Sequence, residues 1–216
     1  MKSILLGAVF CVGILLPKIL PGQNQGGRAV TDTMALAEFR GIGLGINAVV
    51  YIRQGEFQQV TVQGPDALLQ NLSREVKDGI WDIHYVDRTQ ASDSLRITIV
   101  MKRITWLAIG GSGAIVAERP LKLSNALELS LGGSGYIDLK GTAPELRANL
   151  AGSGKINAEG LEVQKAVISV AGAGEARITV IQSLEASIAG SGKVWYQGPA
   201  QVKSSVAGSG FVRQIN

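Results

Sequence analysis

The chain has little of the chemistry on which many enzymes and disulfide-rich proteins depend. Its 216 residues include one cysteine, one histidine and 5% aromatic residues. A single histidine, His84, excludes a multi-histidine metal centre and cannot serve as the base for several serine nucleophiles. A single cysteine, Cys11, excludes an intramolecular disulfide framework. The sequence therefore gives no reason to expect a cofactor or a metal ion.

An excess of charge of one sign is also missing. The chain has 21 basic and 17 acidic residues, and residues 1–22 hold two of the basic ones, Lys2 and Lys18, and no acid. The remainder thus carries 19 basic against 17 acidic residues, a formal charge of +2. No cluster of lysine and arginine interrupts this balance, so nucleic acid is not an expected partner.

The N-terminus has the pattern of an export signal. After one early lysine, an apolar run extends from Ile4 to Leu16 and ends at a proline. This run is short for a membrane span, which needs about 20 apolar residues. We therefore predict a signal peptide over residues 1–22, cut after Gly22, and an N-terminal linker over residues 23–34. The mature protein would then be extracytoplasmic (periplasmic, on the outer surface or secreted) and free of cysteine, the alternative being an uncleaved leader that serves as an anchor.

Glycine, by contrast, is abundant, with 28 residues, and much of it recurs in one pattern. A Gly-Ser-Gly or Gly-Ala-Gly triplet occurs six times, and successive first glycines are 22, 19, 20, 18 and 18 residues apart. Recurrence at this period indicates one structural unit per repeat, stacked on its neighbours. The glycines of the triplets are Gly111 and Gly113, Gly133 and Gly135, Gly152 and Gly154, Gly172 and Gly174, Gly190 and Gly192, and Gly208 and Gly210.

Alternating apolar residues lie on both sides of the triplets. Residues 127–131 (Leu-Glu-Leu-Ser-Leu) precede one triplet, and Ile137 follows it after one intervening residue. This alternation is typical of strands with one buried face. We predict an all-β fold: a single-stranded, right-handed parallel β-helix, or solenoid, with about 20 residues per coil. The triplets would be the corners of the coils, because glycine adopts a positive φ without a Cβ clash.

The region before the repeat is also rich in strand patterns. Residues 41–51 alternate, residues 65–72 fit a short helical turn, and residues 76–83 place Asp-Gly between two alternating segments, which predicts a hairpin. A polar loop follows at residues 90–94, and a further strand at 95–99. We expect this region to continue into the solenoid because no linker separates the two.

These features together resemble a known family. Phe39-Arg40-Gly41-Ile42, the Val60-x-Val62-x-Gly64 segment, the hairpin and the triplet array resemble the autotransporter-adhesin head domain family, a domain family of unknown function common in the Bacteroidota. The resemblance covers residues 35–214. It implies an extracytoplasmic β-helix head domain over these residues and a role in adhesion, and it implies no catalytic residues.

Other interpretations of the triplets fit less well. A nucleophile elbow needs Gly-x-Ser-x-Gly, and five equivalent serines cannot share one histidine. A phosphate loop needs a helix after the glycines, and no helical pattern follows. A calcium-binding roll needs a column of acids, but only Asp138 occupies the relevant position, one residue late. A structural corner is the remaining interpretation.

We therefore predict an exported, non-enzymatic solenoid that serves as an adhesin or another surface-binding or structural protein. Its partner would be a cell-surface protein or a glycan, and coil edges could pair in a homo-oligomer. Trp195, Tyr196 and Tyr136 are candidate stacking aromatics for a sugar, although strand alternation places Trp195 and Tyr196 on opposite faces.

The alternative is a carbohydrate-active enzyme that acts on a polysaccharide. Its site would lie in the N-terminal section, where Asp82, His84, Asp87 and Arg88 are close in sequence. Carboxylates and a histidine are residues that general acid–base chemistry uses.

Overall fold

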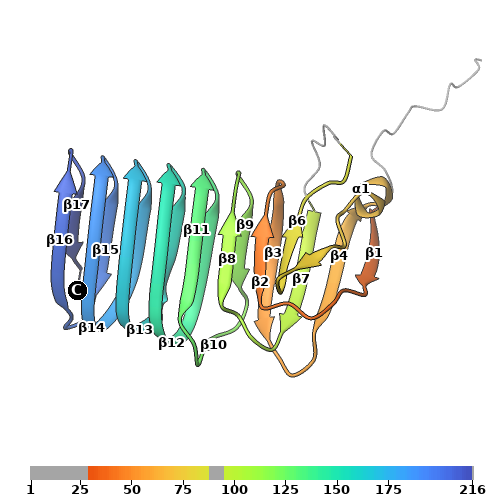
Figure 1. Ribbon diagram of the computed structural model, residues 1–216, viewed down its shortest axis with the longest axis horizontal. Helices are drawn as coiled ribbons and strands as arrows, with labels where there is room; N and C mark the ends of the chain where they lie inside the picture. The colour runs from red at the N-terminus through yellow and green to blue at the C-terminus, as the bar shows by residue number, and fades with distance from the viewer. Residues whose placement is uncertain (1–28, 88–94, 216) are drawn as a thin grey trace, which may run out of the picture.

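The computed structural model describes residues 29–87 and 95–215. They form an all-β protein in which coils stack as a solenoid of about five turns, about 20 residues apart (Figure 1). The predicted solenoid fold is therefore confirmed. The predicted leader (1–22), the first part of the predicted linker (23–28) and the polar loop (90–94) lie outside the described residues. Within the described residues, no helix is long and apolar enough to cross a membrane.

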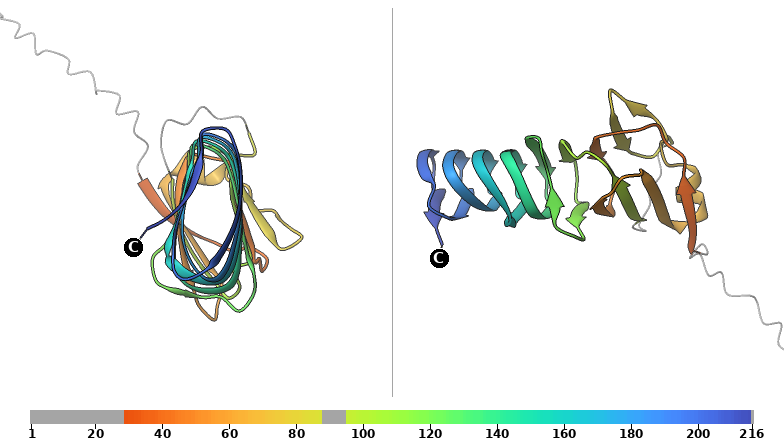
Figure 2. Two further views of the ribbon diagram at one scale, coloured as in Figure 1. Left: turned by 90° about the vertical axis from the view of Figure 1, so that its left-hand side faces the viewer. Right: turned by 90° about the horizontal axis from the view of Figure 1, so that it is seen from below.

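Each regular coil contributes to two opposite faces. Within each face, the strands of neighbouring coils pair in parallel, and the coils seen end-on form a flattened ring (Figure 2). The first face precedes the triplets and contains β8 (Trp106–Ile109), β11 (Leu127–Gly133), the later parts of β12 (Tyr136–Gly152), β13 (Lys155–Gly172) and β14 (Glu175–Gly190), and β16 (Gln201–Ala207). The second face follows the triplets and contains β9 (Ala114–Ala117), the earlier parts of β12, β13 and β14, β15 (Lys193–Gln197) and β17 (Phe211–Gln214). The short strand β10 (Leu121–Lys122) pairs with the middle of β12.

The glycine triplets form the corner at which the chain passes from the first face to the second. Gly152 lies opposite Gly133 on one side and Gly172 on the other, in register. Gly172 has a φ of +113°, a conformation that residues with a side chain rarely adopt. The middle residue of each triplet is exposed, so serine and alanine are both accommodated there.

Side chains that point inward from both faces form a continuous apolar core. On the first face, Leu131, Leu150, Val170 and Ile188 follow one another in register, and all four are buried. The second face contributes equivalent columns, and one cluster of buried residues runs through the described chain from Met34 to Val194. This burial supplies the main favourable free energy of the fold.

The N-terminal coils are arranged in an order that the sequence did not predict. Strands β2 (Gly41–Leu44) and β3 (Ala48–Gln54) lie between β8 and β9 on one side and β6 (Ile80–Ile83) and β7 (Leu95–Met101) on the other. In chain order, the coil of β2 and β3 thus comes first and the outer coil of β6 and β7 comes later. Residues 102–105 then cross back over the coil of β2 and β3 to reach β8.

An antiparallel layer and a short helix cover this end of the solenoid. Strand β4 (Gln59–Pro65) pairs antiparallel with β7, and β1 (Ala29–Met34) pairs antiparallel with β4. Residues 29–34 of the predicted linker thus form a strand, in which Met34 is buried and pairs with Val60.

Two local predictions for this end are confirmed. The helical turn is α1 (Asp66–Gln70), which buries Leu68 and Leu69. The hairpin joins β5 (Val76–Lys77) to β6 through Asp78 and Gly79, which have φ values of 54° and 75°.

Candidate binding sites

The three predicted stacking aromatics do not form one surface. Trp195 and Tyr196 are neighbours on β15, and Tyr196 packs against the buried core, whereas Trp195 lies opposite the exposed Arg177 and Arg213 on the outer side. Tyr136 lies on β12, three coils away from β15, because β13 and β14 lie between them. Of the three, Trp195 and Tyr136 therefore remain as separate candidates on the outer side.

Trp195 is the centre of a cluster of aromatic and guanidinium groups. It lies directly between Arg177 and Arg213 in neighbouring coils, with guanidinium carbons 6.0 and 5.7 Å from the ring centre. The ring of Phe211 meets it edge-on at 4.9 Å, and Arg213 also lies 4.9 Å from the centre of the Phe211 ring. Cation–π attraction thus holds two arginines beside these rings. The indole is partly covered, so it is not a bare platform for a sugar.

Charged side chains continue this surface toward β12. Arg177 donates a hydrogen bond of 2.8 Å to Glu175, and Lys155 lies 3.7 Å from the same carboxylate. Burial alone would raise the pKa of Glu175, but the hydrogen bond from Arg177 and the charges of Lys155 and Lys193 outweigh it and lower that pKa below its ordinary value. Glu175 is therefore held as a carboxylate.

A cavity of about 210 Å³ lies within this charged surface, and Asn157 is one of its lining residues. The Nδ2 of Asn157 donates a hydrogen bond of 3.0 Å to Asp138, while its buried Oδ1 has no hydrogen-bond partner among the described residues. A buried polar atom without a partner is uncommon in a folded protein. We call this surface the outer row; it comprises Tyr136, Lys155, Asn157, Glu159, Glu175, Arg177, Trp195, Phe211 and Arg213.

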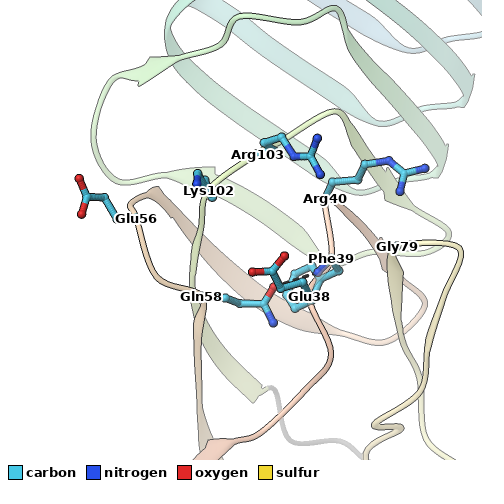
Figure 3. A pocket seen from close by; sticks show the side chains of 8 residues that line it. All are labelled: Glu38, Phe39, Arg40, Glu56, Gln58, Gly79, Lys102 and Arg103. Atoms are coloured by element: carbon cyan, nitrogen blue, oxygen red, sulfur yellow. Dashed lines mark hydrogen bonds between the residues drawn. The ribbon is translucent and has the colours of Figure 1, made fainter.

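A second cavity, of about 380 Å³, lies at the N-terminal coils, at the ends of the strands opposite the glycine corners (Figure 3). Its walls come from four segments: the connection from β1 to β2, the loop from β3 to β4, the hairpin turn and the crossing from β7 to β8. We call it the N-terminal pocket; its lining residues are Glu38, Phe39, Arg40, Glu56, Gln58, Gly79, Lys102 and Arg103.

Gln58 fixes one wall of this pocket. Its side chain accepts a hydrogen bond of 2.9 Å from the backbone N–H of Phe39 and donates to the carbonyl oxygens of Ala37, at 2.9 Å, and Leu36, at 3.3 Å. In Figure 3 the side chain of Arg103 extends toward Arg40 from the opposite wall. No motif in the sequence marks this pocket, because its residues are far apart in the chain.

The described residues of the predicted enzymatic site are exposed to solvent. The Nδ1 of His84 is 3.4 Å from the carboxylate of Asp82, and the two side chains are 46% and 68% exposed. Asp87 is also exposed, and Arg88 lies outside the described residues. The structure thus brings Asp82 and His84 together, but without the water-excluded surroundings that strengthen acid–base and electrostatic catalysis.

The described residues hold no group of three or more histidine, cysteine, aspartate or glutamate side chains placed to bind a metal ion. They do hold two polar sites on the outer surface, the outer row and the N-terminal pocket. The fold is that of a β-solenoid domain. Residues 38–200 match the family described as "Putative auto-transporter adhesin, head GIN domain", and the chain belongs to this family.

Solved structures show a similar fold. A protein described as a putative adhesin from Bacteroides fragilis matches with a TM-score of 0.72 and 22% identity, over 87% of this chain and 97% of its own. A protein described as a putative lipid-binding protein from Parabacteroides distasonis matches with a TM-score of 0.56 and 22% identity, over 88% of this chain and 98% of its own. At this identity the likeness concerns the fold. No curated protein matches the chain.

Proposed function

We propose that this protein is an exported, non-enzymatic adhesin that binds a cell-surface glycan or protein through the outer row. The family description and the description of the Bacteroides fragilis protein support an adhesive role at the cell surface. The apolar run near the N-terminus supports export. After cleavage, the exported chain would begin at Gln23. The intact mass of the protein recovered from the producing cell tests this cleavage.

The observation that carries the proposal is the ordered set of polar side chains around the cavity of the outer row. Asn157, Glu175 and Arg177 all line this cavity, and Arg177 donates a hydrogen bond of 2.8 Å to Glu175. Hydrogen-bonding groups held in fixed positions recognise a polar ligand because they lose little conformational entropy when it binds. Hydroxyl or amide groups of a glycan or a peptide would bind to these side chains.

The enzymatic alternative has weaker support. Asp82 and His84 are close to each other but largely exposed, and the family description names an adhesin. The test is to incubate the protein with a panel of polysaccharides. If reducing ends or unsaturated products were released, and Asp82→Ala abolished their release, the non-enzymatic proposal would be wrong.

Binding of the purified protein to an array of glycans and cell-surface proteins tests the proposal. We expect a subset of ligands to bind and Asn157→Ala to weaken that binding. The matched control is Asn149→Ala, which removes an exposed asparagine from the first face. Absence of binding by the unmodified protein, or equal loss in both variants, would count against the outer row as the binding surface.

A further inference from the structure

We infer that the N-terminal pocket is a separate binding site for a carboxylated saccharide, such as a uronic acid unit of an acidic polysaccharide. Three basic residues line it, Arg40, Lys102 and Arg103. None of these three side chains forms an ion pair with a carboxylate of the described residues, whereas Arg147 and Arg177 do. Their charges are therefore available to an anionic ligand.

The acidic residues of the pocket form no ion pair with these three side chains. Glu38 and Glu56 line the same cavity, but in Figure 3 the carboxylate of Glu56 points outward. The carboxylate of Glu38 lies across the cavity from Arg103. This separation leaves a cationic wall and an acceptor wall on opposite sides, which suits a ligand that carries both a negative group and hydroxyl donors.

The pocket is held in shape before any ligand arrives. Beyond the three hydrogen bonds of Gln58, the backbone N–H of Arg40 donates to the carbonyl oxygen of Gly79 at 2.8 Å, and the carbonyl oxygen of Arg40 accepts from the backbone N–H of Thr105 at 2.9 Å. These bonds tie the connection before β2 to the hairpin turn and to the crossing segment. Preorganised walls reduce the entropy lost on binding.

The size of the pocket also fits a saccharide unit. The volume of about 380 Å³ is at the small end of the range for ligand pockets, which is about 300–1,000 Å³.

The inference stands apart from the proposed function, because the N-terminal pocket lies at the N-terminal coils whereas Trp195 lies on β15, near the other end of the solenoid (Figure 1). Failure of one site therefore does not imply failure of the other.

Titration calorimetry with oligogalacturonate tests the inference, with neutral galacto-oligosaccharides of equal length and inorganic phosphate as comparison ligands. We expect oligogalacturonate to bind and Arg103→Gln to weaken it about tenfold or more, because a hydrogen bond to a charged group is lost. Lys140→Gln, which removes an exposed lysine of β12, should leave this binding unchanged.

Several results would overturn the inference. Equal binding of the neutral oligosaccharide would show that the carboxylate is not recognised. Competition by inorganic phosphate at the concentrations at which oligogalacturonate binds would show a general anion site. An unchanged affinity in Arg103→Gln, with circular dichroism confirming its fold, would place any binding elsewhere.

Discussion

Gly172 lies directly opposite Gly152 in the neighbouring coil, and a Cβ added to Gly172 would lie 2.7 Å from the Gly152 carbonyl oxygen. Both residues have positive φ, +113° and +118°. Close backbone approach and backbone conformation therefore both require glycine at this corner. The same relationship holds at Gly133, Gly190 and Gly208, which explains why the first glycine recurs in these triplets while the middle residue changes.

The first prediction concerns this corner. Gly172→Ala should lower the free energy of unfolding by about 1–3 kcal/mol, the usual cost of a residue held in an unfavourable backbone region. Ala173→Ser is the control, because position 173 is exposed and serine occupies the middle of the other triplets. Urea unfolding of both variants measures the difference, and equal stability would contradict the role assigned to Gly172.

The second prediction concerns the core. Ile168 is 1% exposed and lies between Ala148 and Ala186 of the neighbouring coils, so its side chain fills space that the two alanines leave. Ile168→Ala should cost about 2–5 kcal/mol, because lost burial and a cavity add together. The adjacent Val167 is 40% exposed, and Val167→Ala should change stability by no more than about 0.5 kcal/mol. Similar losses in both variants would mean that residue 168 does not point into the core.

The third prediction concerns pH. Because the folded protein lowers the pKa of Glu175 below its ordinary value of 4.5, its ion pairs stabilise the fold above that pH and are lost as the pH falls through the lower, folded value. In Glu175→Gln, the free energy of unfolding should therefore fall less steeply below pH 4.5 than in the unmodified protein. The difference should be less than about 1 kcal/mol.

Thermal unfolding over the acid range measures this effect. Glu185→Gln is the comparison, because the Glu185 side chain is 60% exposed and its partner Lys203 is 85% exposed. An unchanged pH profile in Glu175→Gln would contradict the prediction.

The fourth prediction concerns association through a coil edge. Strand β16 pairs with β14 on one side, and its inward-column residues Val202 and Val206 are 39% and 41% exposed. Such an edge offers unpaired backbone groups and apolar side chains to a second copy. We expect the mass measured by light scattering to rise with concentration, and Val206→Lys to reduce that rise. A constant monomer mass in the unmodified protein would show that this edge does not mediate association.

The regular coils could be predicted because each carries its own signal. Apolar residues such as Leu129 and Leu131 alternate with polar ones, and the glycine triplet marks the same corner in each repeat. The hairpin was predictable for a similar local reason, since Asp78 and Gly79 both adopt positive φ in the turn. Local conformational preference and tertiary structure agree in these elements.

The remaining features depend on contacts between distant residues. Strand β1 has polar residues at Thr31, Asp32 and Thr33, so its pairing with β4 gives almost no pattern in the sequence. Strand β2 pairs with β6 on one side and β8 on the other, and the alternation of apolar residues does not encode which strands pair. The N-terminal pocket follows from both, because four separate segments meet there.

The in-register stacking of the glycine corners is the central claim, and disulfide cross-linking tests it most directly. With Cys11→Ser in the background, the pair Ser153→Cys and Ala173→Cys places two cysteines one coil apart, about 4.8 Å, within the Cα separation of about 4.4–6.8 Å that a disulfide allows. The pair Ser134→Cys and Ala173→Cys places them two coils apart, roughly 9.6 Å, beyond that range. After mild oxidation, intact mass and non-reducing electrophoresis should show an intramolecular disulfide in the first pair and free thiols in the second. Free thiols in the first pair, or equal cross-linking in both, would contradict the stacking.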